Sequence, residues 1–246
     1  MKFDPRNLVL WSDETLLVVN KPAGLPTLPD GYDPQLPYLK SLLEPVFGRL
    51  WIVHRLDRET SGVLVLARTA ETHRTLNTQF EARQLSKAYH ALLKGTPPWD
   101  EKTIDLPLRP DGDRKHRTIV DHRQGRPSVT GLRVLERLGQ YTLVEALPKT
   151  GRTHQVRVHL AAQGFPIAAD ALYGDGKGIY LSEIKTGYHP GRGGEHPLLG
   201  RLGLHAWSLT IEHPLTRIEL CFEAPYPKDL ASTLGQMRRY LSQESS

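Results

Sequence analysis

The chain has 246 residues, enough to bury a full hydrophobic core in one large domain or in two small ones. Its 32 Lys and Arg residues against 27 Asp and Glu residues give a formal net charge of +5. This modest excess indicates a basic face of the kind that contacts nucleic acid, and it argues against a polycationic tail. Cys221 is the only cysteine, which excludes an intrachain disulfide and a zinc site built from cysteines.

The first ten residues lack the apolar stretch of a secretory signal peptide. No apolar run along the chain approaches the length that crosses a bilayer. We therefore expect a cytoplasmic protein with no membrane partner.

Two short strands are predicted within residues 8–20, and a stiff loop follows them. Pro22 and Pro26 remove backbone donors there, and Gly24 can take a positive φ. Such a loop can present Lys21, although the residue types alone favour a plain connector.

A densely polar stretch, residues 54–62, lies between two apolar runs. Within it, Asp57 stands between Arg55 and Arg58, and nearby cations favour the ionised form of a carboxylate. A polar run held by core-forming segments on both sides is a usual place for chemistry. A surface turn with local ion pairs is the alternative, since exposed ion pairs are common and weak.

Hydrophobic periodicity and turn signals predict the remaining elements. They are a helix at 39–46, a buried strand at 62–67, a helix at 69–83 capped by Thr69 or Thr72, a strand at 86–94, strands at 129–138 and 141–147, a helix from Thr153 to Gly164, strands at 204–211 and 217–222, and a helix from Pro227. The stretch 174–203 looks the least regular. Because strands mostly come in sequential pairs, we expect a single α+β domain, residues 1–246, with a central mixed, largely antiparallel β-sheet flanked by helices and loops.

Residues 109–126 concentrate cations around a short predicted strand at 118–120. Gly112 and Gly125 mark turns on either side of this strand, which predicts a basic hairpin. Such a hairpin can follow a phosphate backbone. A solvated edge hairpin, whose charges deter aggregation, is the alternative.

A second polar cluster, residues 150–160, coincides with the start of a predicted helix. His154 and Arg157 are three residues apart and should share a helix face. From that face Arg157 can reach a carboxylate such as Asp57. Arg152 lies at the helix N-terminus, where phosphate binds readily.

Spacing argues against several other kinds of site. His154 and His159 are five residues apart with no carboxylate between them, whereas zinc helices place two histidines four apart around a glutamate. A glycosidase pair of Asp57 and Glu59 has no second acidic cluster to support it. A Walker loop, a dinucleotide fingerprint and a nucleophile elbow are absent from the sequence, and we expect no metal site.

Five motifs in the right order resemble the RluA-type RNA pseudouridine synthases over nearly the whole chain. They are residues 17–24, His54-Arg55-Leu56-Asp57 with Thr60-Ser61-Gly62, Lys87-Ala88-Tyr89, residues 151–159, and Leu204-His205-Ala206 with residues 213–216. The resemblance implies the pseudouridine synthase fold with its RNA-binding cleft. It also implies that no metal or organic cofactor is needed.

The resemblance assigns catalytic roles residue by residue. Asp57 would attack the target uridine, at the ring or at the sugar carbon, and Arg157 would pair with Asp57. Tyr89 would stack on the flipped base and remove the ring proton. Arg55 would hold the RNA open where the uridine has left the stack, and Leu204 would pack against the base.

Further substrate contacts are expected from Arg152, and from His54 and Thr60 in the second motif. The RNA phosphates would be held by residues 109–126 together with Arg152. This agrees with the chemistry, because a glycosidic bond can be broken and remade only when the base has left its stack. An ionised carboxylate is then the nucleophile, and an aromatic face holds the detached base.

Some features depart from the family's pattern. The residues at 8–24 already match catalytic sequence, so we expect no separate N-terminal RNA-binding domain. The usual glycine before the aspartate of the family's G-D-x-x-Y-G segment is Ala169 here. The stretch 177–201 looks longer than in compact members.

The expected function is that of an isomerase acting on structured RNA, with ribosomal RNA ahead of transfer RNA and no obligate protein partner. An RNA-binding protein of the same fold that has lost its activity is the alternative. The presence of Asp57, Tyr89 and Arg157 argues against it, because a binding protein does not need all three. A metal-dependent hydrolase is a distant third reading.

Overall fold

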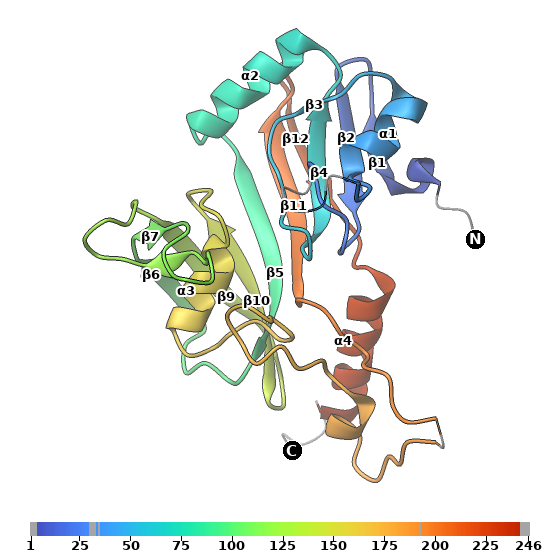
Figure 1. Cartoon of the computed structure of the whole chain (residues 1–246), viewed down its shortest axis with the longest axis vertical. Coiled ribbons are helices and arrows are strands. Elements are labelled where there is room, and N and C mark those ends of the chain that lie inside the picture. Colours follow the sequence, from blue (N-terminus) through green and yellow to red (C-terminus); the bar gives the residue numbers. More distant parts are fainter. Residues whose placement is uncertain (1–3, 30–32, 34, 192, 242–246) are drawn as a thin grey trace. The chain divides into compact units, whose positions relative to one another are not determined.

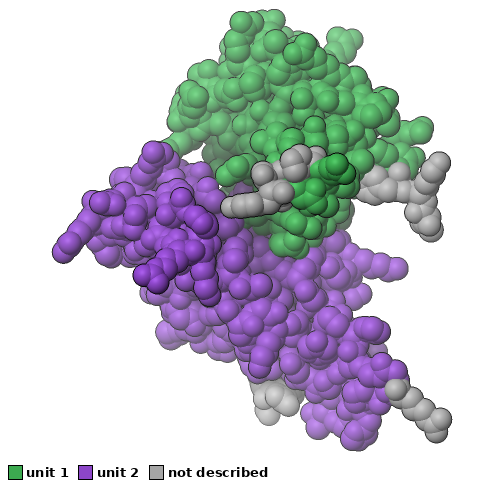
Figure 2. Space-filling model, in the orientation of Figure 1, with its two compact units in different colours: residues 1–88, 205–225 green, residues 89–204, 226–246 purple. Residues whose placement is uncertain are grey.

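The structure is a computed structural model that describes residues 4–29, 33, 35–191 and 193–241. It has an α+β fold in which strand pairing is mixed and largely antiparallel, as the sequence predicts. The chain forms two compact units, coloured separately in Figure 2: unit 1 is residues 1–88 and 205–225, and unit 2 is residues 89–204 and 226–246. A single catalytic domain over the whole chain stays a prediction. None of the helices that the structure describes is long and apolar enough to cross a membrane.

The sheet of unit 1 is built around one fully buried strand. Its strands are β1 (Val9–Ser12), β2 (Leu16–Lys21), β3 (Trp51–Ile52), β4 (Ser61–Ala67), β11 (Leu204–Glu212, whose first residue belongs to unit 2) and β12 (Glu219–Glu223). Their order is β1-β2-β4-β11-β12, and β3 pairs with the end of β4. The β4–β11 pair is parallel and the other pairs are antiparallel. Every residue of β4 is buried, which explains its continuous apolar sequence.

The helices described in unit 1 are the 3₁₀ helix η1 (Pro5–Leu8), α1 (Leu39–Phe47) and α2 (Ala70–Glu81). Helices α1 and α2 begin where their sequence signals place them, whereas η1 was not predicted. Thr69 caps α2 by accepting the N–H of Thr72 at 3.1 Å, as the sequence predicts. Gln79 of α2 then bonds to both backbone groups of Glu212, at 2.8 and 3.2 Å, and fixes the helix to the end of β11.

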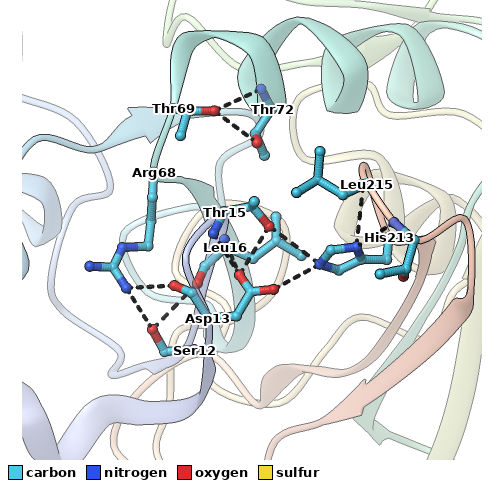
Figure 3. Close-up of polar contacts among 10 residues, drawn as sticks. Ser12, Asp13, Thr15, Leu16, Arg68, Thr69, Thr72, His213 and Leu215 are labelled. Atoms are coloured by element: carbon cyan, nitrogen blue, oxygen red, sulfur yellow. Dashed lines mark hydrogen bonds and ion pairs between the residues drawn. The ribbon is translucent and has the colours of Figure 1, made fainter.

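A hydrogen-bonded cluster joins the turn after β1 to the turn after β11 (Figure 3). Asp13 accepts the N–H groups of Thr15 and Leu16, each at 2.7 Å, and its other oxygen lies 2.8 Å from Nε2 of His213. Nδ1 of His213 accepts the N–H of Leu215, so Nε2 carries a proton and donates it to Asp13. Burial would raise the pKa of Asp13, but these hydrogen bonds lower it below its usual value.

Unit 2 is an antiparallel sheet with a helix against it. Its strands are β5 (Ser86–Lys94, whose first three residues belong to unit 1), β6 (Glu101–Asp105), β9 (Val129–Leu138) and β10 (Tyr141–Pro148), in the order β5-β10-β9-β6. Helix α3 (Gln155–Ala162) lies against β9 and β10 (Figure 1). The remaining elements are the small hairpin of β7 (Leu108–Arg109) and β8 (Ile119–Val120), the 3₁₀ helix η2 (Leu181–Glu183) and α4 (Lys228–Leu241).

The stretch 174–203, which looks irregular in the sequence, is irregular in the structure but well anchored. Apart from η2 and one bridge between Ile179 and Leu199, its described residues form no regular element. Ile179, Ile184 and Leu199 are nevertheless buried in one cluster with α4. Arg201 adds a bidentate ion pair with Asp229 at 2.7 and 2.8 Å.

Candidate active site

The motif that contains His54 and Asp57 forms an irregular loop, residues 53–60, between β3 and β4. The N–H of Thr60 donates to the carbonyl of Asp57 at 3.1 Å, which closes a turn directly after the aspartate. Asp57 is half-buried. Because Asp57 and Glu59 lie in this turn and not on a strand, strand alternation does not align their side chains.

Lys21 supports this loop through hydrogen bonds and is not presented to a ligand. Its side chain is fully buried, and Nζ donates to the carbonyls of Pro22, Leu25 and Arg58 at 2.9, 2.7 and 3.1 Å. A buried ammonium is tolerated when such acceptors replace water. The N–H of Gly24 also donates to Arg58, so the Lys21 loop and the Asp57 loop are held together.

Two more contacts fix the chain on either side of Asp57. Before it, Thr27 Oγ1 both donates to the carbonyl of Leu56 at 3.1 Å and accepts the N–H of Leu56 at 3.3 Å. After it, Ser61 Oγ lies 2.9 Å from Nδ1 of His205, whose Nε2 lies 2.9 Å from the carbonyl of Ala224. A carboxylate on a loop braced at both ends has little freedom, which suits a reacting group.

His54 acts as a neutral packing residue in the structure. Its Nε2 accepts the N–H of Val65 at 3.1 Å, and its ring stacks on Phe80 with 4.7 Å between centroids. Burial, with a smaller effect from the charge of Lys87, lowers the pKa of His54 to about 3. Burial also lowers the pKa of Lys87, whose Nζ lies 6.0 Å from the centre of the Phe80 ring.

Three other residues of this loop differ in their surroundings. Arg55 is exposed and has no ion pair among the residues that the structure describes. Arg58 donates to the carbonyl of Gly24 and lies 3.6 Å from Glu59. Thr60 is buried, and its hydroxyl finds no hydrogen-bond partner within the described part of the chain.

Unit 2 brings two of the predicted site residues into one apolar cluster. Leu204 is buried beside Val156 and Ala146, and Tyr89 packs against the same cluster. Tyr89 pairs with Ala146 in the register of β5 and β10, which sets its position along the strand. Val156 is the second residue of α3, so Tyr89 and Leu204 lie near the start of the helix that carries Arg157.

Arg157 forms a buried bidentate ion pair with Asp170, which sequence reasoning did not assign as its partner. Its Nε and Nη2 donate to the two carboxylate oxygens at 2.8 Å each. The Arg157 and Asp170 side chains are 7% and 0% exposed. Burial would raise the pKa of Asp170, but the hydrogen bonds and charge of Arg157 lower it. The predicted pairing of Arg157 with Asp57 joins residues of different units and stays a prediction.

The prediction that His154 and Arg157 share a helix face was wrong. Helix α3 begins at Gln155, and His154 is its N-cap residue in the left-handed region, with φ 55°. Helical spacing therefore does not apply to His154. A left-handed residue cannot be recognised from the pattern of apolar positions.

Other residues of the motif at 151–159 anchor α3 to β9. Gln155 donates to the Thr130 hydroxyl at 2.9 Å, and Nδ1 of His159 lies 2.9 Å from the same oxygen. Nε2 of His159 lies 3.1 Å from the carbonyl of Leu106, and burial lowers the pKa of this histidine. Among the described residues no group of three His, Cys, Asp or Glu side chains could hold a metal ion.

The cations of the basic hairpin, residues 109–126, divide into two kinds. Arg109 pairs with Asp121 at 2.7 Å and Arg117 pairs with Asp113 at 2.8 Å, which holds the hairpin together. Four more cations are exposed and have no ion pair among the residues described, namely Arg114, Lys115, Arg123 and Arg126. Arg152 differs from them in being half-buried, and its Nε is buried without a hydrogen-bond partner in the described chain.

Comparison with known proteins identifies the family of this chain. The sequence profile of the family described as RNA pseudouridylate synthase matches residues 15–162. The chain belongs to this family. It is 35% identical over 243 residues to the ribosomal large subunit pseudouridine synthase D of Neisseria meningitidis serogroup B, covering 97% of this chain and 63% of that protein.

Two further relatives support the assignment to the RNA pseudouridylate synthases. The dual-specificity RNA pseudouridine synthase RluA of Vibrio vulnificus is 35% identical over 216 residues, which cover 86% of this chain and 80% of that protein. The structure titled human RNA pseudouridylate synthase domain containing 4 superposes with a TM-score of 0.72 at 27% identity, covering 95% of each chain. The chain spans a little under two thirds of the length of the Neisseria relative.

Proposed function

We propose that this chain isomerises specific uridines to pseudouridine in structured RNA. The observation that carries the proposal is the span of the family profile, residues 15–162, which includes Asp57, Tyr89 and Arg157. The Neisseria relative is named for the large ribosomal subunit and the Vibrio relative for dual specificity. These names favour ribosomal RNA as the substrate, with transfer RNA second.

In the proposed reaction the N1–C1′ bond of the uridine breaks and a C5–C1′ bond forms, while the proton on C5 leaves and N1 gains one. The bond that the nucleophile makes to the nucleotide breaks again before the product leaves. Asp57 is the nucleophile, at the ring or at the sugar carbon, and Arg157 favours its ionised form. Tyr89 stacks on the flipped base and takes the C5 proton, while Leu204 packs against the base. Atoms and charge balance without a cofactor, since substrate and product are isomers.

The RNA would be held through its phosphates and at the gap left by the flipped base. Arg55, exposed beside Asp57, would fill that gap. Arg152 and the unpaired hairpin cations would contact phosphates. His54 and Thr60 would support binding indirectly by shaping the Asp57 loop, because His54 is hydrogen-bonded to the N–H of Val65 and Thr60 is buried.

Transcriptome-wide pseudouridine mapping tests this proposal. A strain without the gene should lose pseudouridine at defined sites, and the wild-type gene should restore them. Asp57→Ala should restore none while the purified variant still binds the same RNA. Glu81→Ala, which removes an exposed carboxylate at the end of α2, is the matched control and should behave as wild type. Unchanged pseudouridine in the deletion strain would favour the inactive RNA-binding protein instead.

A further inference from the structure

The ring of Tyr173 lies near two arginines of unit 2 that have different proposed tasks. Cζ of Arg157 is 5.1 Å from the centre of its ring, and Cζ of Arg117 is 5.9 Å from it. Arg117 belongs to the basic hairpin, which we propose contacts RNA, and Arg157 is the proposed catalytic guanidinium. A guanidinium over an aromatic face is attracted by the ring's quadrupole, so one ring constrains both side chains.

The hydroxyl of Tyr173 makes a second connection between the same two elements. It accepts the N–H of Thr118 at 3.1 Å, and Thr118 is a buried residue of the hairpin just before β8. It also lies 3.0 Å from Nδ1 of His154, the residue on which α3 begins. Burial raises the pKa of Tyr173, so at neutral pH the phenol keeps its proton and can donate it to His154 while accepting from Thr118.

Asp170 completes the path from the tyrosine to Arg157. Besides its two bonds to Arg157, Oδ1 accepts the N–H groups of Leu172 and Tyr173 at 2.9 and 3.1 Å. From the other side, Nη1 of Arg117 donates to the carbonyl of Leu172 at 2.7 Å. The segment from Asp170 to Tyr173 is therefore bonded to the catalytic candidate at one end and to the hairpin at the other.

We propose that Tyr173 is a positioning residue that couples RNA contact at the hairpin to the orientation of Arg157. This rests on the proposed function, which gives Arg157 its catalytic task and the hairpin its RNA. A shift of the hairpin moves Arg117 and Thr118, both of which contact Tyr173, and the ring in turn contacts Arg157. Coupling of this kind is reciprocal, so the arrangement of Arg157 also biases the hairpin toward its RNA-binding form.

A simple packing role does not account for these contacts. Tyr173 is half-buried and Leu172 beside it is exposed, so the segment contributes little to the apolar core. Its polar groups make the connections instead: one phenol hydroxyl, two backbone N–H groups and one carbonyl. Each of them bonds to the hairpin, to the start of α3 or to Asp170.

The test compares the affinity for RNA with the rate at which the protein–RNA complex reacts. Arg117→Gln, Tyr173→Phe and Tyr173→Leu are made in the full chain, and the substrate is a transcript spanning a uridine found by the mapping experiment. The dissociation constant and the single-turnover rate at saturating RNA are measured for each. Asp175→Asn is the matched control. Asp175 lies two residues after Tyr173, and its substitution breaks an exposed ion pair with Lys94.

Coupling predicts that Arg117→Gln lowers the saturated rate as well as the affinity, although Arg117 is outside the catalytic candidates. Tyr173→Leu should lower the saturated rate by about 100-fold, the size expected from a misplaced catalytic group. Tyr173→Phe keeps the ring but leaves the Thr118 N–H unpaired, so it should weaken RNA binding by up to about tenfold and change the saturated rate less. Asp175→Asn should match the wild type.

The outcomes separate this inference from the proposed function. If the wild type is active and both Arg117→Gln and Tyr173→Leu lose only RNA affinity, the coupling is overturned and the proposed function stands. The coupling would also be overturned if the losses of rate and affinity simply matched the loss of folded protein, measured by thermal unfolding. If Tyr173→Leu does not fold, the saturated rate of Arg117→Gln decides. A wild type that forms no pseudouridine in any RNA refutes the function, and the coupling is rejected with it.

Discussion

A Cβ atom placed on Gly62 would lie 2.2 Å from the carbonyl oxygen of Ala206. The two residues face each other in the parallel register of β4 and β11, one position after the pair of Ser61 and His205. Gly62 also has φ +121°, a conformation that residues with a side chain rarely adopt. Any residue with a side chain at position 62 would therefore prevent β4, the strand that follows the Asp57 loop, from approaching β11 this closely.

Replacing Gly62 with alanine should destabilise the protein by at least about 3 kcal/mol, because the methyl group meets backbone atoms that cannot move aside. Gly235→Ala is the matched control. Gly235 lies inside α4 with nothing within 4 Å of its added Cβ, so that change should stabilise by about 0.5–1 kcal/mol. Urea unfolding measures both, and a Gly62→Ala variant as stable as wild type would contradict the close approach.

Ala169 adopts φ 57° where the family's pattern has glycine, and this conformation strains an alanine by about 1–2 kcal/mol. Ala168 beside it is also buried and is not in the left-handed region. Ala168→Gly and Ala169→Gly lose the same methyl group, but only the second relieves strain. We expect Ala169→Gly to be about 1–2 kcal/mol less destabilising than Ala168→Gly in urea unfolding. Equal effects would mean that the left-handed backbone carries no cost here.

The unpaired cations of the hairpin should dominate its salt dependence. Arg114→Ala combined with Lys115→Ala should weaken RNA binding and reduce the slope of log affinity against log salt by about 0.7–0.9 per charge removed. The control removes the same charge elsewhere, with Arg74→Ala and Arg239→Ala, both exposed residues. Filter binding between about 50 and 200 mM salt gives the slopes. Identical slopes in the two double variants would argue against phosphate contact by the hairpin.

The strands and helices follow closely from the sequence because their signals are local. Apolar periodicity and a capping threonine place α2, and a glycine turn between two apolar runs places β9 and β10. Three strands were not predicted, namely β3, β6 and β7. In β3 and β7 only two residues pair, and β6 is a charged edge strand with one buried side chain. Such strands are defined by their neighbours and leave little pattern of their own.

The candidate site is less predictable, since its supports come from distant parts of the chain. The polar loop around Asp57 is visible as a break between two apolar runs. No local pattern indicates that Lys21 donates its hydrogen bonds to backbone carbonyls, or that Ser61 contacts His205, 144 residues away. Likewise, the sequence distinguishes Asp170 only by the alanine that precedes it and does not indicate its pairing with Arg157. The tyrosine three residues later is the signal that could have linked Asp170 to Arg157.

His54 offers a prediction about pH because burial lowers its pKa to about 3. In the unfolded chain an imidazole has a pKa near 6.5 and binds a proton below that pH. The folded protein does not bind this proton until about pH 3, so the unfolded state gains stability as the pH falls. Folding stability should therefore decline from pH 6.5 downward, with a slope approaching about 1.4 kcal/mol per pH unit from this residue.

Substituting His54 with glutamine should remove this part of the decline. The amide oxygen can accept the Val65 N–H in place of Nε2 but has no proton to gain, while the stacking on Phe80 is lost at every pH. Urea unfolding at pH 7 and pH 5 should show the wild type losing up to about 2 kcal/mol more than His54→Gln over this interval. The interval lies above the titration of most carboxylates, and the buried His159 is present in both proteins. Equal losses would mean that His54 can bind a proton in the folded protein.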